Sequence, residues 1–212
     1  MCIMKQYFSW IHHTRTGHNS GILRMAHYLI RKFINITSKK EKIMATFKLK
    51  GNPVNTNGSL PGIGQTAPDF ILTKSDLKDL SLSDLKGKTI ILNIFPSVDT
   101  PVCSASVRRF NKEATDLPGV VILGVSLDLP FAHSRFCEAE GIKNVISLSE
   151  LRNRDFGDAY GLRINEGALK GLLARAVIII DKESRIVYAK LVEELSNEPD
   201  YEEVLQIVKN HL

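Results

Sequence analysis

An apolar run that leads directly into a helix start is the feature that most constrains the fold. Residues 89–95, Thr-Ile-Ile-Leu-Asn-Ile-Phe, have the length and composition of a buried strand. Pro-Ser-Val-Asp-Thr-Pro-Val-Cys follows at 96–103, and the pattern after it is helical. Thr100 is a good N-cap residue and Pro101 suits the N1 position. Cys103 is therefore expected at N3, in the first turn of a helix that follows a core strand.

A cysteine at this position has a specific chemistry. It is a nucleophile only as the thiolate, and the positive end of a helix dipole stabilises that anion. The alternative interpretation is that Cys103 is a small buried hydrophobic residue, as many lone cysteines are. The Thr-Pro-x-Cys cap directly after a core strand favours the reactive thiol.

Strand and helix patterns alternate along most of the chain, which predicts an α/β domain with a mixed central sheet flanked by helices. Thr46–Lys50, followed by Asn52-Pro53 and the turn signal Asn57-Gly58, predicts an N-terminal β-hairpin. The further expected elements are strands at 70–73, 89–95, 120–126 and 145–148, helices at 102–115, 130–139 and 155–160, a hairpin of 176–180 with 186–191, and a closing helix at 199–212.

Charge is unevenly distributed between the first 43 residues and the rest. The chain has 28 Lys and Arg against 23 Asp and Glu, a net charge of +5. Residues 1–43 contain eight of these basic residues and one acid, so the remaining 169 residues have a net charge of −2. We therefore exclude nucleic-acid binding by the folded part. No apolar run approaches the roughly 18 residues of a membrane-spanning helix.

Residues 1–43 are expected to be an N-terminal extension of a domain formed by residues 44–212. Within the extension, residues 21–36 have the pattern of a basic amphipathic helix, which is typical of targeting or membrane-surface segments. Three interpretations stay open: a disordered or misassigned start upstream of Met44, a real anchor or targeting segment, and a neutral extension. Membrane contact is expected only if the extension is real.

The chain has three cysteines, which do not make a disulfide framework. Cys2 lies in the extension. Taken alone, Cys137 is a cysteine on an amphipathic helix and is best interpreted as core packing. His133 lies four residues before it, but a single His–Cys pair is a poor metal site. We therefore expect no metal and a structural or exposed His133.

Three arginines have contrasting contexts. Arg175 directly precedes the very apolar strand 176–180, where a buried charge is costly unless it is paired. The residues alone favour an exposed strand end for Arg175 and leave a paired, functional guanidinium as the alternative. Arg108 and Arg109, on the helix after Cys103, are expected to be solvated.

The motif Pro-x-x-x-Thr-x-x-Cys, at Pro96, Thr100 and Cys103, resembles the active-site signature of the peroxiredoxins. Residues 92–100, 128–141, 169–181 and 198–202 resemble one subfamily in particular, the bacterial thiol peroxidases. The resemblance extends from about Ala45 to the C-terminus with the motifs in the same order. It implies a thioredoxin-like fold.

The resemblance also implies roles for individual residues. Cys103 is the implied peroxidatic nucleophile, which becomes a sulfenic acid. Cys137 is the implied resolving cysteine, which would convert that sulfenic acid into an intramolecular Cys103–Cys137 disulfide. Thr100 would hydrogen-bond the sulfur and the peroxide, and Pro96 would shield the site from water. Arg175 would hold the thiolate and polarise the peroxide.

The implied activity is that of an antioxidant peroxidase that reduces hydrogen peroxide and organic hydroperoxides without a cofactor. Thioredoxin is the implied reductant, and a cytoplasmic homodimer is the implied form. Two alternatives stay open: a one-Cys peroxidase whose Cys137 is silent, and a redox sensor that passes oxidation to a partner protein. A disulfide reductase is disfavoured because Ser106 stands three residues after Cys103, where a Cys-x-x-Cys motif needs a second cysteine.

Overall fold

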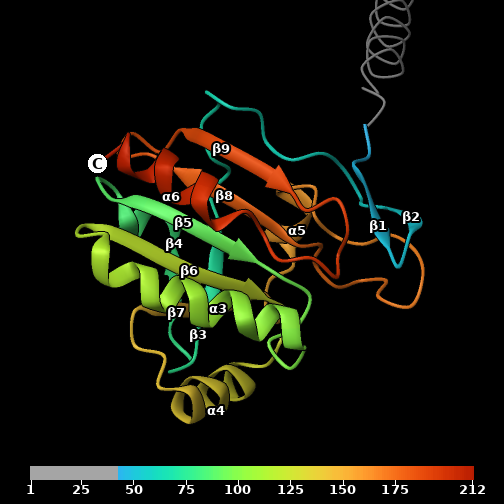
Figure 1. Cartoon of the computed structure of the whole chain (residues 1–212), viewed down its shortest axis with the longest axis horizontal. Helices are drawn as coiled ribbons and strands as arrows, with labels where there is room; N and C mark the ends of the chain where they lie inside the picture. Colours follow the sequence, from blue (N-terminus) through green and yellow to red (C-terminus); the bar gives the residue numbers. More distant parts are fainter. Residues whose placement is uncertain (1–42) are drawn as a thin grey trace, which may run out of the picture. The chain divides into compact units, whose positions relative to one another are not determined.

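The structure is a computed structural model that describes residues 43–212 (Figure 1). The basic helix predicted at 21–36 and Cys2 lie outside the described residues, as does nearly all of the predicted extension. Among the helices within residues 43–212, none is long and apolar enough to cross a membrane.

Seven strands of this region form one mixed sheet. They are β3 (Ile71–Lys74), β4 (Asp79–Ser81), β5 (Thr89–Ile94), β6 (Val120–Ser126), β7 (Val145–Ser149), β8 (Ala176–Ile180) and β9 (Ile186–Leu191). Their order is β4-β3-β7-β6-β5-β8-β9 (Figure 1). The β5–β6 and β6–β7 pairs are parallel, and the other neighbours are antiparallel. The predicted mixed sheet is confirmed.

β5 lies in the middle of the sheet, and all six of its residues are buried. Ile90, Leu92 and Ile94 pack into the hydrophobic core on one face. Ile91 and the following Phe95 pack into the core on the other face. A central strand with parallel pairing is covered on both faces, which explains why this run is apolar without alternation.

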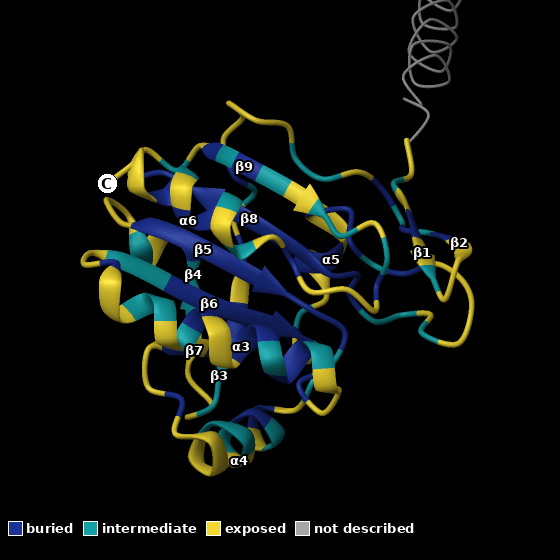
Figure 2. Cartoon of the chain, viewed as in Figure 1, coloured by how far each residue is buried: buried dark blue, intermediate teal, exposed yellow. Residues whose placement is uncertain are grey.

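The described helices are α3 (Pro101–Glu113), α4 (Pro130–Glu140), α5 (Asp155–Ala159) and α6 (Tyr201–Lys209), with 3₁₀ turns η1 (Leu82–Leu85) and η2 (Ala114–Asp116). α3 and α6 lie over the same face of the sheet, where Phe110 and Val204 join Ile91 in one core (Figure 1). α5 contributes Phe156 to the core of the opposite face. The sheet centre is buried, and the outer faces of α3 and α4 are exposed (Figure 2).

The predicted N-terminal hairpin is present as β1 (Thr46–Leu49) and β2 (Asn52–Asn55). Its turn is formed by Lys50 and Gly51, both with positive φ, 53° and 81°. A two-residue turn with positive φ at both residues matches the twist of the flanking strands, and glycine adopts this conformation without strain. The Asn57-Gly58 turn signal therefore follows the second strand and does not connect the two strands.

Several element boundaries differ from those predicted. α3 begins at Pro101, where the capping pattern placed N1 and one residue before the predicted range 102–115, and its end continues as the 3₁₀ turn η2. The closing helix begins at Tyr201 because Asp200 caps it, its carboxylate accepting a hydrogen bond from the Glu203 N–H at 3.0 Å, and it ends at Lys209, before the predicted end at 212. β4 and η1 were not predicted, since their short, partly exposed sequence carries no strong periodicity.

Candidate active site

Cys103 occupies the predicted place in the first turn of α3. Thr100 is the N-cap residue with extended backbone angles, and Pro101 is N1. The Cys103 side chain is fully buried, in the core shared by α3 and the sheet. Free backbone N–H groups and the helix dipole both favour an anion in this turn. The local sequence thus places the thiol in the first turn of the helix, as predicted.

Thr100 holds the loop before α3, which we call the active-site loop (residues 96–100). Its hydroxyl donates to the Ser97 carbonyl at 3.0 Å, and its backbone N–H donates to the same oxygen at 3.2 Å. The side chain therefore closes a turn and does not cap the helix, although Thr100 is at the N-cap position. Because the hydroxyl proton is used in the turn, the oxygen lone pairs are what Thr100 offers to a ligand.

Arg175 lies beside Cys103 in space, although the two residues are far apart in the sequence. The antiparallel pairing of β5 with β8 places Ala176 opposite Ile94, so Arg175 lies where β5 ends. Its Nη2 lies 3.5 Å from Cys103 Sγ. The side chain is only 2% exposed, so the exposed strand end that the residues alone favoured is wrong.

The Leu195 carbonyl fixes the orientation of this guanidinium. It accepts from Arg175 Nε at 3.2 Å and from Nη2 at 3.1 Å. Arg175 Nη1 is buried and has no hydrogen-bond partner within residues 43–212. Nη1 therefore keeps its N–H donors free within these residues. Sequence reasoning missed Leu195, because a backbone carbonyl leaves no side-chain signal.

Pro96 is buried and lies two residues after the end of β5. The next residues bond to Asp128, which follows β6. Asp128 accepts from the Ser97 hydroxyl and from the Val98 N–H, both at 2.7 Å. Sequence reasoning gave Asp128 no role, because a loop aspartate is usually solvated.

Cys137 lies on α4 and is half-buried. Its Sγ is 3.4 Å from the Ser147 Oγ on β7. Both Cys103 and Cys137 are free thiols in this structure. A disulfide between these two helix-borne cysteines would need their Cα atoms within about 7 Å.

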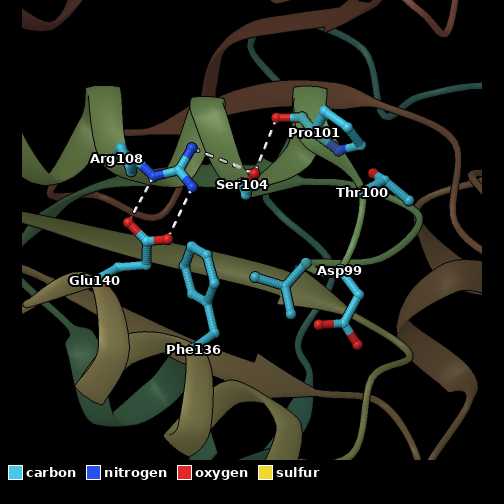
Figure 3. Close-up of a pocket in the computed structure, with 8 residues that line it drawn as sticks. Asp99, Thr100, Pro101, Ser104, Arg108, Phe136 and Glu140 are labelled. Atoms are coloured by element: carbon cyan, nitrogen blue, oxygen red, sulfur yellow. Dashed lines mark hydrogen bonds and ion pairs between the residues drawn. The ribbon is translucent and has the colours of Figure 1, made fainter.

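A cleft of about 440 Å³ separates the start of α3 from α4. Figure 3 shows Arg108 of α3 facing Glu140 of α4 across it, with bonds of 2.8 and 2.9 Å from Arg108 Nε and Nη2. Arg108 lowers the pKa of the Glu140 carboxyl by this hydrogen bonding. Arg109 pairs with Glu113 at 2.7 Å. Both arginines are exposed as predicted, but each also forms an ion pair.

His133 was predicted to be either structural or exposed. It is buried, which agrees with the structural alternative. Its Nε2 lies 3.1 Å from the Ser126 Oγ. Burial lowers the pKa of this imidazole, against the opposing effect of Asp128 and Asp99. Within residues 43–212, no three His, Cys, Asp or Glu side chains are grouped to hold a metal ion.

Comparison with known proteins gives this geometry a context. A family model described as Redoxin matches residues 63–205. The chain is 49% identical over 162 residues to a thiol peroxidase of Mycobacterium bovis, covering 76% of this chain and 97% of that protein. A peroxiredoxin-like protein from Aquifex aeolicus is 44% identical with a TM-score of 0.76, covering 80% of this chain and 99% of that one. A thiol peroxidase from Chromobacterium violaceum, 22% identical over 78% and 95% of the chains, shares the fold with a TM-score of 0.72.

The chain belongs to the redoxin family, as a peroxiredoxin-type oxidoreductase with the predicted thioredoxin-like fold, and its relatives place it among the thiol peroxidases. The subfamily resemblance seen in the sequence motifs is thereby confirmed.

Proposed function

We propose that Cys103 is the peroxidatic thiol that reduces hydrogen peroxide and organic hydroperoxides. The observation that carries this proposal is the 3.5 Å contact between Arg175 Nη2 and Cys103 Sγ, both of them buried. A guanidinium stays charged at any physiological pH, and its forked donors can address two acceptors at once. It therefore stabilises the thiolate and has a further donor for the peroxide.

The first step is a two-electron transfer. The Cys103 thiolate attacks the terminal peroxide oxygen, forming an S–O bond as the O–O bond breaks. The departing oxygen takes a proton and leaves as water or an alcohol, and the sulfur becomes a sulfenic acid. Arg175 Nη1, buried and without a partner within the described residues, would donate to the departing oxygen. The Thr100 lone pairs would accept from the peroxide O–H, and Pro96 would exclude water.

In the second half of the cycle, the Cys137 thiol attacks the sulfenic sulfur of Cys103. An S–S bond forms and water leaves. A dithiol protein of the thioredoxin type then opens the disulfide by two exchange reactions and is itself oxidised. No metal or organic cofactor enters this scheme.

A one-Cys cycle is the second candidate. The observation in its favour is that Cys137 Sγ packs toward Ser147 of β7 from within an intact helix. In that cycle a small thiol would reduce the Cys103 sulfenic acid directly.

The test is thioredoxin-linked peroxide turnover by Cys103→Ser and Cys137→Ser. Cys103→Ser is expected to abolish turnover, and Cys137→Ser to remove most of it. Full thioredoxin-linked activity of Cys137→Ser would establish the one-Cys cycle instead. Activity of Cys103→Ser would show that another group reacts with peroxide.

We also propose that the protein works as a cytoplasmic homodimer. A thioredoxin-type reductant operates in a reducing compartment, which supports the location. Leu129 and Phe131, 49% and 64% exposed at the start of α4, supply apolar surface for a partner copy. Light scattering on the purified protein tests the oligomeric state, and a monomer at all concentrations would exclude the dimer.

A further inference from the structure

A carboxylate outside the Cys103–Arg175 pair is bonded to the active-site loop. Asp128 Oδ1 accepts from the Ser97 hydroxyl, and Oδ2 accepts from the Val98 N–H and the Ser126 hydroxyl, all three at 2.7 Å. Short bonds to an ionised carboxylate are about twice as strong as neutral ones. Asp128 is thus the main polar anchor of Ser97 and Val98.

These bonds continue to the turn that contains Cys103. The Ser97 carbonyl accepts both hydrogen bonds of Thr100, and the Thr100 carbonyl accepts from the Ser104 N–H at 2.9 Å, within the first turn of α3. Val98 is 1% exposed and packs in the same core as Cys103. The position of the thiol therefore depends on residues that Asp128 holds.

The same carboxylate is connected to the helix that contains Cys137. Asp128 directly precedes Leu129, the N-cap residue of α4, whose carbonyl accepts from the His133 N–H at 3.2 Å. Ser126 links Asp128 to the His133 ring through its hydroxyl. Asp128 is thus bonded directly to the active-site loop and is linked through Ser126 to the helix that contains Cys137.

We propose that Asp128 is a positioning residue for the peroxide step: it holds the active-site loop so that Cys103 faces Arg175, and it restrains the opening that disulfide formation needs. This inference rests on the proposed function. The two effects are opposite in sign. Loss of the carboxylate slows the attack on peroxide, and it leaves the following disulfide step unchanged or faster.

The test measures the two steps separately, by rapid quench with peroxide and mass spectrometry of the quenched protein. The rate of Cys103 sulfenylation is measured with and without the Asp128 substitutions in a Cys137→Ser background. The rate of disulfide formation is measured with and without them in the protein that keeps both cysteines. Asp128→Ala is expected to slow sulfenylation by about tenfold or more, since small misplacements of a reacting group carry penalties of that order. Asp128→Asn should lie between, because its amide oxygen still accepts from Val98. The exposed Asp116→Ala is the matched control and should react at the parent rate.

Ser97→Ala is the control for a folding defect. It removes one of the three donors to Asp128 and leaves the carboxylate in place. It should slow sulfenylation less than Asp128→Ala does. Sulfenylation within twofold of the parent in both Asp128 variants would overturn the proposal, and so would an equal slowing of both steps. If no disulfide forms in the parent, the two-cysteine cycle fails, while the sulfenylation rates still decide whether Asp128 positions Cys103.

Discussion

Arg175 brings a positive charge into the protein interior, where a guanidinium is tolerated only beside acceptors. The Leu195 carbonyl is one acceptor, and the Cys103 sulfur, which is nucleophilic as an anion, is the other. In the proposed mechanism the interaction is mutual, because a thiolate would compensate the buried charge and the charge would favour the thiolate. Two residues 72 positions apart in the chain thus depend on each other.

Arg175→Lys tests the need for the forked group. An ammonium keeps the charge but cannot bond the Leu195 carbonyl and the sulfur in the same planar geometry. We expect Cys103 sulfenylation to slow by about 100-fold, the usual effect of removing one transition-state donor. The exposed Arg185→Lys serves as control, measured by the same quenched-flow assay. An Arg175→Lys rate within threefold of the parent would show that charge alone suffices.

A second residue-scale prediction concerns the polar chain behind Cys103. Asn93 Nδ2 donates to the Ser106 Oγ at 3.1 Å, and Ser106 donates to the Cys103 carbonyl at 2.8 Å, all within the core. Ser106→Ala leaves the buried amide without its acceptor. The free energy of unfolding should fall by about 1–3 kcal/mol in urea denaturation. Ser134→Ala, on the partly exposed side of α4, should change it by about 0.5 kcal/mol or less.

At the scale of elements, α4 is attached to the sheet through His133. Burial lowers the pKa of this histidine, so the unfolded chain binds a proton that the folded protein excludes. Stability is then at its full value above about pH 6.5, the ordinary pKa of histidine, and is lost as the pH falls below it.

His133→Gln should therefore flatten the acid limb of the stability curve. Between pH 6.5 and 5, the parent is expected to lose up to about 1.4 kcal/mol per pH unit more than the variant does. Urea unfolding at a series of pH values measures this slope. The exposed His211→Gln is the control and should follow the parent, and equal slopes for the parent and His133→Gln would contradict the prediction.

α3 and α4 should both open during turnover if the two-cysteine cycle operates. Each cysteine lies inside a hydrogen-bonded helix, and disulfide geometry brings Cα atoms closer than about 7 Å. We expect amide hydrogen exchange at 100–108 and 130–141 to rise on oxidation, while α6 stays protected. Equal exchange of these segments in the reduced and oxidised proteins would argue against the opening.

At the scale of the whole molecule, the sequence predicted those elements whose structure depends on neighbouring residues in the chain. The buried strand β5 and the Thr100–Pro101 helix start could be identified from sequence, because burial and capping leave their own signatures. The turn at Lys50–Gly51 was missed, since Asn57-Gly58 carried the stronger hairpin signal.

The assembly of the site was not visible in the residues alone. Arg175 reaches Cys103 only through the β5–β8 pairing, so its burial depends on tertiary structure. Leu195 acts through a backbone carbonyl, and Asp128 acts through a loop contact between distant segments. The residues alone left a functional Arg175 as the less favoured alternative, which the family resemblance then preferred, and no sequence signal identified the other two.

The central claim is that Cys103 reduces peroxide and passes its oxidation to Cys137. The most direct measurement is intact mass with non-reducing peptide mapping, on reduced protein given one equivalent of hydrogen peroxide. We expect a loss of two hydrogens and a cross-linked Cys103–Cys137 peptide, with the Cys2 peptide still a free thiol. Oxygen added to Cys103 without the cross-link would contradict the two-cysteine cycle, and the absence of a rapid change at Cys103 would contradict the peroxidatic role itself.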